Sequence, residues 1–164
     1  KNMPDLEIKY SLQNEQLGVA HALLQAEKLV PRDAKILYIL GDNFFEFNPL
    51  IDFDISKSNA SIFLTQVSNP EEFGVVEIVE DRIKSIQEKP LNPKSDYIAV
   101  GLYLFDNHCF KYIKSIQKSD RGEYEITSLI EKYLDNNDLN FQFTNGWWID
   151  AGTPEAIETI EKLL

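Results

Sequence analysis

One stretch decides the expected fold, Lys35-Ile36-Leu37-Tyr38-Ile39-Leu40-Gly41-Asp42-Asn43. Its apolar run shows no polar alternation, which is typical of a strand buried on both faces at the centre of a parallel, helix-covered sheet. Asp42 then follows the carboxyl end of that strand, where open α/β sheets bind their ligands. Gly, Asp and Asn are also the commonest turn residues. The stretch alone therefore leaves a ligand site and a simple turn equally open.

Size and composition indicate one globular domain, residues 1–164, with 43% hydrophobic residues. Sixteen basic against 27 acidic residues give a net charge of −11, and the basic residues form no cluster. We therefore expect neither a nucleic-acid polymer nor a membrane as partner. No apolar run approaches the roughly 20 residues of a membrane span, and the first residues do not resemble a signal peptide. The expected location is the cytoplasm.

The cysteine and the two histidines carry no expected chemistry. Cys109 is the only cysteine, so it cannot form an internal disulfide, and beside Phe110 it is predicted to be a small buried apolar residue. His21 and His108 fall on predicted helices without the spacing of metal ligands.

The chain up to the central run is predicted to form a βαβ unit. Residues 6–12 alternate between apolar and polar, as a half-buried strand does, and apolar residues then recur at helical spacing until Pro31. Both loops of such a unit follow the carboxyl ends of strands. We therefore expect Gln13 and Gly18 at the same edge of the sheet as Asp42.

Five further strands are predicted, over residues 60–67, 74–79, 82–88, 97–105 and 139–144. The second and third flank the short acidic turn Glu80-Asp81, so they should form a hairpin. In the fourth, Gly101 leaves room beside Tyr103 for a ligand or a crossing chain, although a bulge or close packing explains it equally well. Helices are expected over about 107–117 and 123–136, and a last one after Thr153, the predicted N-cap.

Two pairs of charged residues follow predicted strands and could bind a ligand. Asp42 and Asp150 each lie beside small or amide residues, and two such carboxylates could hold Mg²⁺ together with substrate phosphates. Glu88-Lys89 places both signs of charge directly before Pro90, which ends the strand. A carboxylate suits sugar hydroxyls and an ammonium suits a phosphate. Taken singly, however, each is more often a solvated surface charge.

Seven segments are specific as a set because of their order and spacing: Leu17-Gly18-Val19-Ala20-His21-Ala22, Leu40-Gly41-Asp42-Asn43, Phe73-Gly74-Val75-Val76-Glu77, Glu88-Lys89-Pro90, Val100-Gly101-Leu102-Tyr103-Leu104-Phe105-Asp106, Gly122-Glu123-Tyr124-Glu125-Ile126-Thr127 and Trp148-Ile149-Asp150-Ala151-Gly152-Thr153. Through them nearly the whole chain resembles the sugar-1-phosphate nucleotidylyltransferases, most closely the glucose-1-phosphate thymidylyltransferases. The resemblance implies an α/β fold with a three-layer, Rossmann-like mixed sheet and an inserted β-hairpin.

The resemblance also implies a reaction, in which a sugar 1-phosphate such as glucose 1-phosphate attacks dTTP or UTP and releases pyrophosphate. Phosphoryl transfer of this kind depends mostly on positioning and charge neutralisation. By that similarity ten residues have roles: Gln13 and Gly18 bind the base, Val19 and Leu40 line the sugar pocket, Gly74, Glu88 and Tyr103 hold the sugar, Lys89 grips its phosphate, and Asp42 and Asp150 bind Mg²⁺.

One part of the family pattern has no match here, namely the first strand with its glycine-rich loop, arginine and lysine. The expectation is therefore an N-terminally truncated enzyme domain that binds a sugar phosphate weakly, does not turn over alone, and forms homo-oligomers through an open sheet edge. A non-catalytic relative that binds or senses sugar nucleotides is the alternative. A receiver-like or phosphatase domain using Asp42 as phosphate acceptor is a third possibility, but it leaves Glu88-Lys89-Pro90 unexplained.

Overall fold

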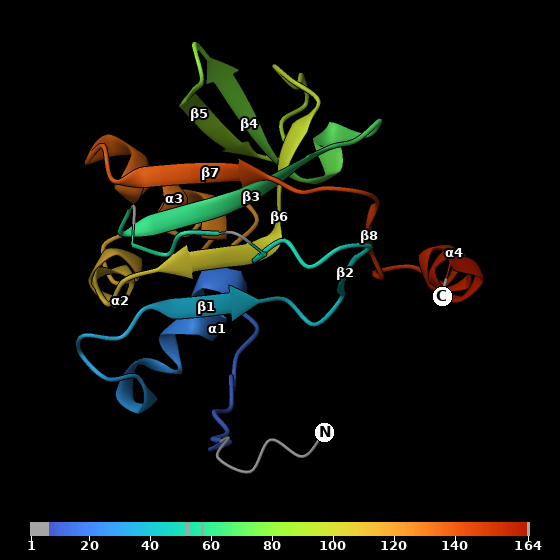
Figure 1. Cartoon of the computed structure of the whole chain (residues 1–164). Helices are drawn as coiled ribbons and strands as arrows, with labels where there is room; N and C mark the ends of the chain where they lie inside the picture. The colour runs from blue at the N-terminus through green and yellow to red at the C-terminus, as the bar shows by residue number, and fades with distance from the viewer. Residues whose placement is uncertain (1–6, 52, 57, 164) are drawn as a thin grey trace.

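A six-stranded sheet forms the body of the computed structural model, which describes residues 7–51, 53–56 and 58–163 (Figure 1). Its strands are β1 (Ile36–Ile39), β3 (Ala60–Gln66), β4 (Gly74–Val79), β5 (Arg82–Glu88), β6 (Tyr97–Phe105) and β7 (Leu139–Phe143). Their order is β5-β4-β6-β3-β7, with β1 also paired to β6. Only β3 and β7 run parallel. The nine residues of β6 are enough to pair with β4 at one end and with β1 at the other.

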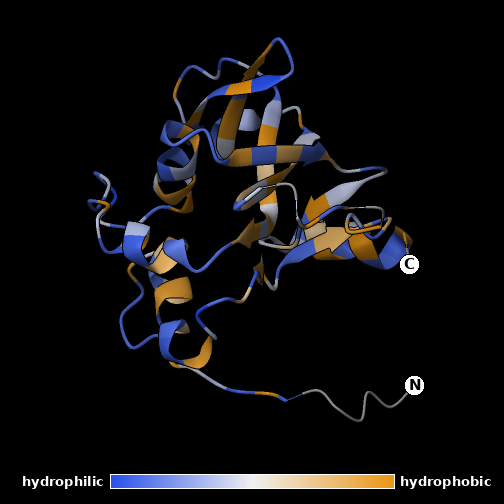
Figure 2. Cartoon of the chain, turned by 60° about the vertical axis from the view of Figure 1, so that its left-hand side comes forward, coloured by the Kyte–Doolittle hydropathy of each residue, from blue (hydrophilic) through white to orange (hydrophobic). Residues whose placement is uncertain are grey.

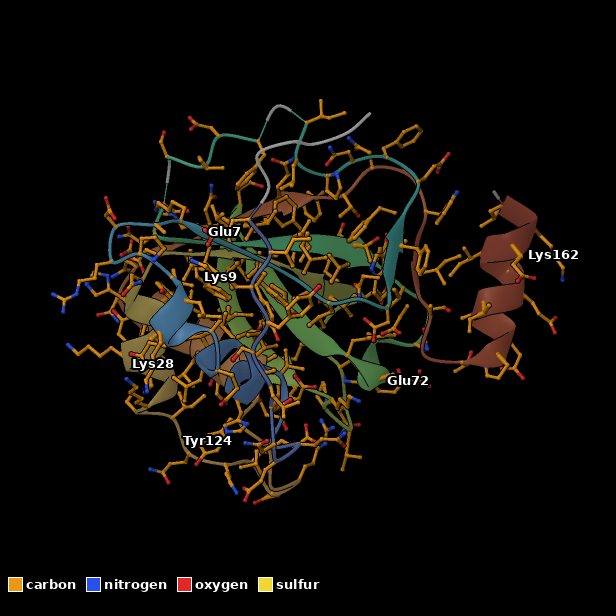
Figure 3. The ribbon with its side chains drawn as sticks, turned by 90° about the horizontal axis from the view of Figure 1, so that it is seen from below. Glu7, Lys9, Lys28, Glu72, Tyr124 and Lys162 are labelled. Atoms are coloured by element: carbon orange, nitrogen blue, oxygen red, sulfur yellow. The ribbon has the colours of Figure 1, made fainter. Side chains whose placement is uncertain are left out.

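The remaining elements are a two-stranded ribbon, four α-helices and two short 3₁₀ helices: β2 (Asn43–Phe45), β8 (Trp148–Asp150), α1 (Val19–Leu24), α2 (His108–Ile113), α3 (Ile126–Asp135), α4 (Pro154–Leu163), η1 (Glu27–Leu29) and η2 (Pro70–Glu72). The ribbon pairs β2 with β8 antiparallel. α4 stands away from the body of the molecule, as its residue Lys162 shows in Figure 3.

Two apolar clusters lie on the two faces of the sheet, because successive strand residues point to opposite sides. On one face, β3, β5 and β6 pack against α1, α2 and α3, around buried residues such as Phe105 and Leu129. On the other face Phe63 and Val100 are covered by Leu50, Phe53 and Trp148. The third layer is therefore a loop and the ribbon rather than a helix. Figure 2 shows the orange apolar residues interleaved with blue polar ones along these strands.

The five strands predicted from residue 60 onward and the last N-cap were predicted correctly. The hairpin β4–β5 and the long strand β6 have the predicted bounds, and β3 and β7 end within one residue of theirs. The hydroxyl of Thr153 accepts a hydrogen bond of 3.2 Å from the backbone N–H of Ala156, as expected of an N-cap. Cys109 is fully buried, and burial raises the pKa of its thiol to about 12.

The prediction of a central, parallel strand at residues 35–40 was wrong. β1 lies at the edge of the sheet and, among the described residues, pairs only with β6 and antiparallel to it. Ile36 is buried, but Leu37 and Ile39 point to the other side and are 42% and 53% exposed. An apolar run shows that a strand can be buried on both faces, but it does not show which neighbours the strand has.

The expected βαβ unit is also absent from the part of the chain that the structure describes. Residues 7–12 form no strand and are all exposed, because alternation alone supplies no hydrogen-bonding partner. Helix α1 ends at Leu24, and the helical spacing continues in the 3₁₀ turn of η1. Similarly, α2 ends at Ile113 rather than near Gln117. Just after this end, the Ser115 hydroxyl donates a hydrogen bond to the Tyr112 carbonyl.

Candidate active site

A cleft of about 220 Å³ opens between the middle of β6, the start of α3 and the ends of β4 and β5. Seven of the ten predicted site residues line it: Val19, Leu40, Gly74, Glu88, Lys89, Tyr103 and Asp150. They come from five strands or helices and from the loops between them. The motifs that lie far apart in the sequence thus meet at one place, as the resemblance implied.

Glu88 and Lys89 both face this cleft although they are neighbours in the chain. In a regular strand they would point to opposite sides. Lys89 instead has a φ of 39°, in the left-handed region, which turns the chain at the end of β5. Its backbone N–H donates to the Phe73 carbonyl over 2.9 Å and fixes this turn. Such a conformation costs roughly 1–3 kcal/mol and persists only where the surrounding structure enforces it.

The Glu88 carboxylate is held at the cleft wall by two groups from the α3 region. Thr127 donates its hydroxyl to Oε2 over 3.1 Å, and Arg121 Nη1 lies 3.4 Å from Oε1. Burial and then the charge of Glu125 raise the pKa of Glu88, while Thr127, Arg121 and Lys89 oppose the rise. Gly74 completes this wall, since a Cβ there would lie 2.8 Å from the Thr127 methyl group.

Arg121 is a cleft residue for which the sequence predicted no role. Its guanidinium lies 3.5 Å from Glu125 and 3.6 Å from Glu123, as well as beside Glu88. Glu125 is buried and also accepts a hydrogen bond of 2.7 Å from Ser119. Arg121 directly precedes the segment Gly122–Thr127, one of those that carried the resemblance. This position was the one feature of the sequence that could have indicated a role for Arg121 in the cleft.

The ribbon brings Asp42 and Asp150 together at the edge of the cleft. Asp150 pairs in register with Asn43, and the Ala151 backbone N–H donates to the Asp42 carbonyl over 2.7 Å. Burial and then the negative charge of Asp42 raise the pKa of Asp150, whereas the Gly152 N–H and the Lys89 ammonium oppose this. A like-charge pair of this kind is stabilised by a cation.

Asn43 is a second residue that the sequence did not single out for a role. Its Oδ1 accepts hydrogen bonds from the Gly101 backbone N–H at 2.7 Å and from the Trp148 indole at 2.8 Å. Its Nδ2 donates to Oδ1 of Asp42 over 2.8 Å. The space left by Gly101 is therefore filled by the Asn43 side chain of a crossing segment. The register of β3 with β6 also shifts there, between the pairs Ile62–Tyr103 and Leu64–Ala99, so the predicted crossing chain and the predicted bulge occur together.

Tyr103 forms the floor of the cleft and is 4% exposed. Burial, followed by the charge of Glu88, raises the pKa of its hydroxyl. The ring stacks on Phe105 with centroids 6.0 Å apart. Tyr103 is thus a neutral, rigid surface suited to a ligand.

Three of the ten predicted site residues, Gln13, Gly18 and Asp42, are not among the residues that line the cleft. The amide of Gln13 donates to the Gly18 carbonyl over 3.2 Å and contacts His21 Nδ1 at 2.9 Å. Gly18 has a φ of 97° and packs against Tyr124, leaving no space for a Cβ. Both residues lie just before α1, whose first residue, Val19, does reach the cleft.

Comparison with known proteins identifies the family. The family model described as "Nucleotidyl transferase" matches residues 1–164. The chain belongs to the nucleotidyl transferase family. Among curated relatives, glucose-1-phosphate thymidylyltransferases from Neisseria meningitidis and Streptomyces antibioticus are 38% and 39% identical, over 93% and 90% of this chain. The chain spans 55% and 43% of the length of these two proteins.

Solved structures of other nucleotidyl transferases have the same fold. A Bacillus anthracis protein assigned as a glucose-1-phosphate thymidylyltransferase, in complex with a sucrose, superposes with a TM-score of 0.85 at 39% identity. The match covers 94% of this chain and 64% of that one. A UDP-glucose pyrophosphorylase complexed with UDP-glucose superposes with a TM-score of 0.79 at 20% identity and supports the fold alone. The Rossmann-like mixed sheet with an inserted hairpin is confirmed.

Two further observations on the described residues concern metals and membranes. The described residues contain no group of three or more His, Cys, Asp or Glu side chains that could hold a metal ion by themselves. In the same part of the chain, no helix is long and apolar enough to cross a membrane.

Proposed function

We propose that the protein transfers a nucleotidyl group from dTTP or UTP to a sugar 1-phosphate, with glucose 1-phosphate as the preferred acceptor. The observation that carries this proposal is the convergence of Glu88, Lys89 and Asp150 on one cleft floored by Tyr103. The curated relatives named as glucose-1-phosphate thymidylyltransferases support the same reaction.

Each cleft residue has a part that suits its chemistry. The Glu88 carboxylate accepts hydrogen bonds from sugar hydroxyls, and Gly74 allows the sugar to approach the backbone. The Lys89 ammonium binds the phosphate of the sugar and keeps its attacking oxygen in place. Val19 and Leu40 form the apolar walls. Gln13 and Gly18, next to α1, are the proposed contacts to the base.

Mg²⁺ is the proposed cofactor, held by Asp42 and Asp150. The chemistry of this pair fits the ion, because Mg²⁺ is usually bound by one or two carboxylates together with substrate phosphates. The negative charge that raises the pKa of Asp150 is what such a cation would offset. When bound, the ion neutralises charge on the phosphate oxygens. The residues with proposed catalytic roles are therefore Asp42, Lys89 and Asp150.

The test measures binding on the 164-residue chain and turnover on the full-length gene product. Glucose 1-phosphate should bind to the chain in calorimetry. The full-length gene product should release pyrophosphate from dTTP or UTP only when the sugar phosphate is present. Binding without pyrophosphate release would favour the non-catalytic sugar-nucleotide-binding relative. Absence of sugar-phosphate binding would contradict both functions.

The proposed setting of this reaction is the cytoplasm, and the proposed assembly is a homo-oligomer. A single buried thiol, Cys109, is compatible with a reducing compartment. The exposed edge of β1 supports association between copies.

A further inference from the structure

We propose that Asn43 is a positioning residue, whose carboxamide is locked by Gly101 and Trp148 and holds the Asp42 carboxylate in one orientation. The inference rests on the proposed function, since it concerns the carboxylate pair offered to a divalent cation. It adds to that function a device that fixes one carboxylate before the cation arrives.

The orientation of the Asn43 amide follows from its partners. A backbone N–H and an indole N–H can only donate hydrogen bonds. Because the Gly101 N–H and the Trp148 indole lie 2.7 and 2.8 Å from Oδ1, the oxygen must face them. The amide NH₂ group is then directed to the other side, where it meets Oδ1 of Asp42 at 2.8 Å.

The two donors hold Asn43 from two different sheets. Gly101 lies in the middle of β6, and Trp148 opens strand β8 of the ribbon. The Trp148 ring is itself fixed by an edge contact with Phe73, with centroids 5.5 Å apart. Asn43 is therefore held more rigidly than a side chain in an exposed loop.

Gly101 is needed for this arrangement because of its missing side chain. A Cβ at position 101 would lie 2.5 Å from Nδ2 and 2.7 Å from Oδ1 of Asn43. A methyl group there would displace Asn43 without changing any polar group of the site. This gives a way to move the amide while keeping its chemistry.

The consequence concerns the free oxygen of Asp42. With Oδ1 bound to the amide, Oδ2 accepts no hydrogen bond from the described residues and stays available to a cation near Asp150. Hydrogen-bonding partners of metal ligands commonly contribute about 10–100-fold to metal affinity. Without the amide, the exposed Asp42 side chain would have to be ordered at the moment of binding.

The test uses Mn²⁺ as an oxygen-seeking substitute for Mg²⁺ and counts the free ion by electron paramagnetic resonance. Asn43→Ala and Gly101→Ala should each weaken Mn²⁺ binding by about tenfold or more. Trp148→Phe removes the indole donor while keeping an aromatic ring of smaller size, and it should have an intermediate effect. Gly41→Ala is the matched control, since a Cβ there meets nothing within 4 Å, and it should bind Mn²⁺ like the parent.

The double variant Asn43→Ala/Gly101→Ala separates positioning from general damage. Removing the Asn43 side chain makes room for the new methyl group, so the double variant should bind Mn²⁺ no worse than Asn43→Ala alone. Thermal melts of every variant show whether it folds, and Asn43→Ala and Trp148→Phe carry the test if Gly101→Ala does not.

Asp42→Asn distinguishes a failure of this inference from a failure of the proposed function. If Asp42→Asn loses Mn²⁺ while Asn43→Ala and folded Gly101→Ala bind it like the parent, the cation site stands and the positioning role is wrong. If the parent and Asp42→Asn bind Mn²⁺ equally, the cation does not use Asp42, and both proposals fail.

Discussion

At the scale of single residues, the backbone of Lys89 decides which side chains face the cleft. Its left-handed φ of 39° sends the side chains of Glu88 and Lys89 to the same side. A carboxylate and an ammonium group thus face the same cleft. Together they suit the proposed ligand, a sugar that carries a phosphate.

Lys89→Ala should weaken glucose 1-phosphate binding by roughly 10–100-fold. The substitution removes a charge-assisted contact worth about 1.5–3 kcal/mol. Calorimetry measures the change, and Lys94→Ala is the control because Lys94 is a surface lysine paired with Glu77. Equal losses in both variants would show that only the overall charge matters.

Glu88→Gln should change the dependence of stability on pH. The fold raises the pKa of Glu88 above 4.5. In the pH window between the unfolded and the folded pKa, the folded chain keeps a proton that the unfolded chain has lost. Stability therefore falls as the pH rises through the window. Glu88→Gln cannot ionise, so it should melt higher than the parent at about pH 8 and nearly equally at about pH 4.

The control for this pH effect is Glu71→Gln, which alters an exposed glutamate on η2. Its melting temperature should follow the parent at both pH values. If the parent instead gained stability relative to Glu88→Gln as the pH rises from about 4 to about 8, the result would contradict the raised pKa of Glu88.

At the scale of elements, the turn of the β4–β5 hairpin contains backbone strain that substitutions can relieve. Its turn residues Glu80 and Asp81 have φ values of 49° and 59°, which Asn and Gly tolerate better. Glu80→Asn/Asp81→Gly should stabilise the fold by about 1 kcal/mol in urea unfolding. Asp135→Gly, which places a glycine in the last turn of α3, should give no such gain.

The elements that could be predicted are those whose information is local. Alternation gave β4 and β5, a long apolar run gave β6, and capping residues gave α4. The place of β1 could not be predicted, because Ile36 and Leu37 are equally apolar and only the neighbouring strands decide which is buried. Residues 7–12 alternate as well, but they pair with no strand of the described sheet.

The site could be predicted from motifs only as far as the motifs carried a known role. Seven of the predicted residues line the cleft. Arg121 and Asn43 were missed because their contacts join segments 33 and 58 positions apart. Sequence spacing gives no indication of a side chain that acts through such distant partners.

At the scale of the whole molecule, the exposed edge of β1 and the net charge oppose each other. Unpaired strand edges with exposed apolar side chains favour association, whereas a net charge of −11 repels other copies. The 164-residue chain should therefore self-associate in sedimentation experiments, and more strongly as salt screens the charge.

Leu37→Lys/Ile39→Lys should abolish most of this association, because it places two cations on the exposed face of β1. Val79→Lys is the matched control, since Val79 is also exposed but lies at the end of β4 in the hairpin. If the control dissociates the chain as well as the β1 variant does, the contact surface is not at β1.

The hydrogen bond between Asn43 and Trp148 joins residues 105 positions apart. During synthesis on the ribosome, β1 and β2 emerge long before β8, and closing so long a loop is entropically costly and slow. The edge of the cleft that carries Asp42 and Asp150 is therefore completed late in folding. A nascent chain that still lacks β8 displays Asp42 without Asp150, so the proposed cation site is incomplete until β8 has emerged.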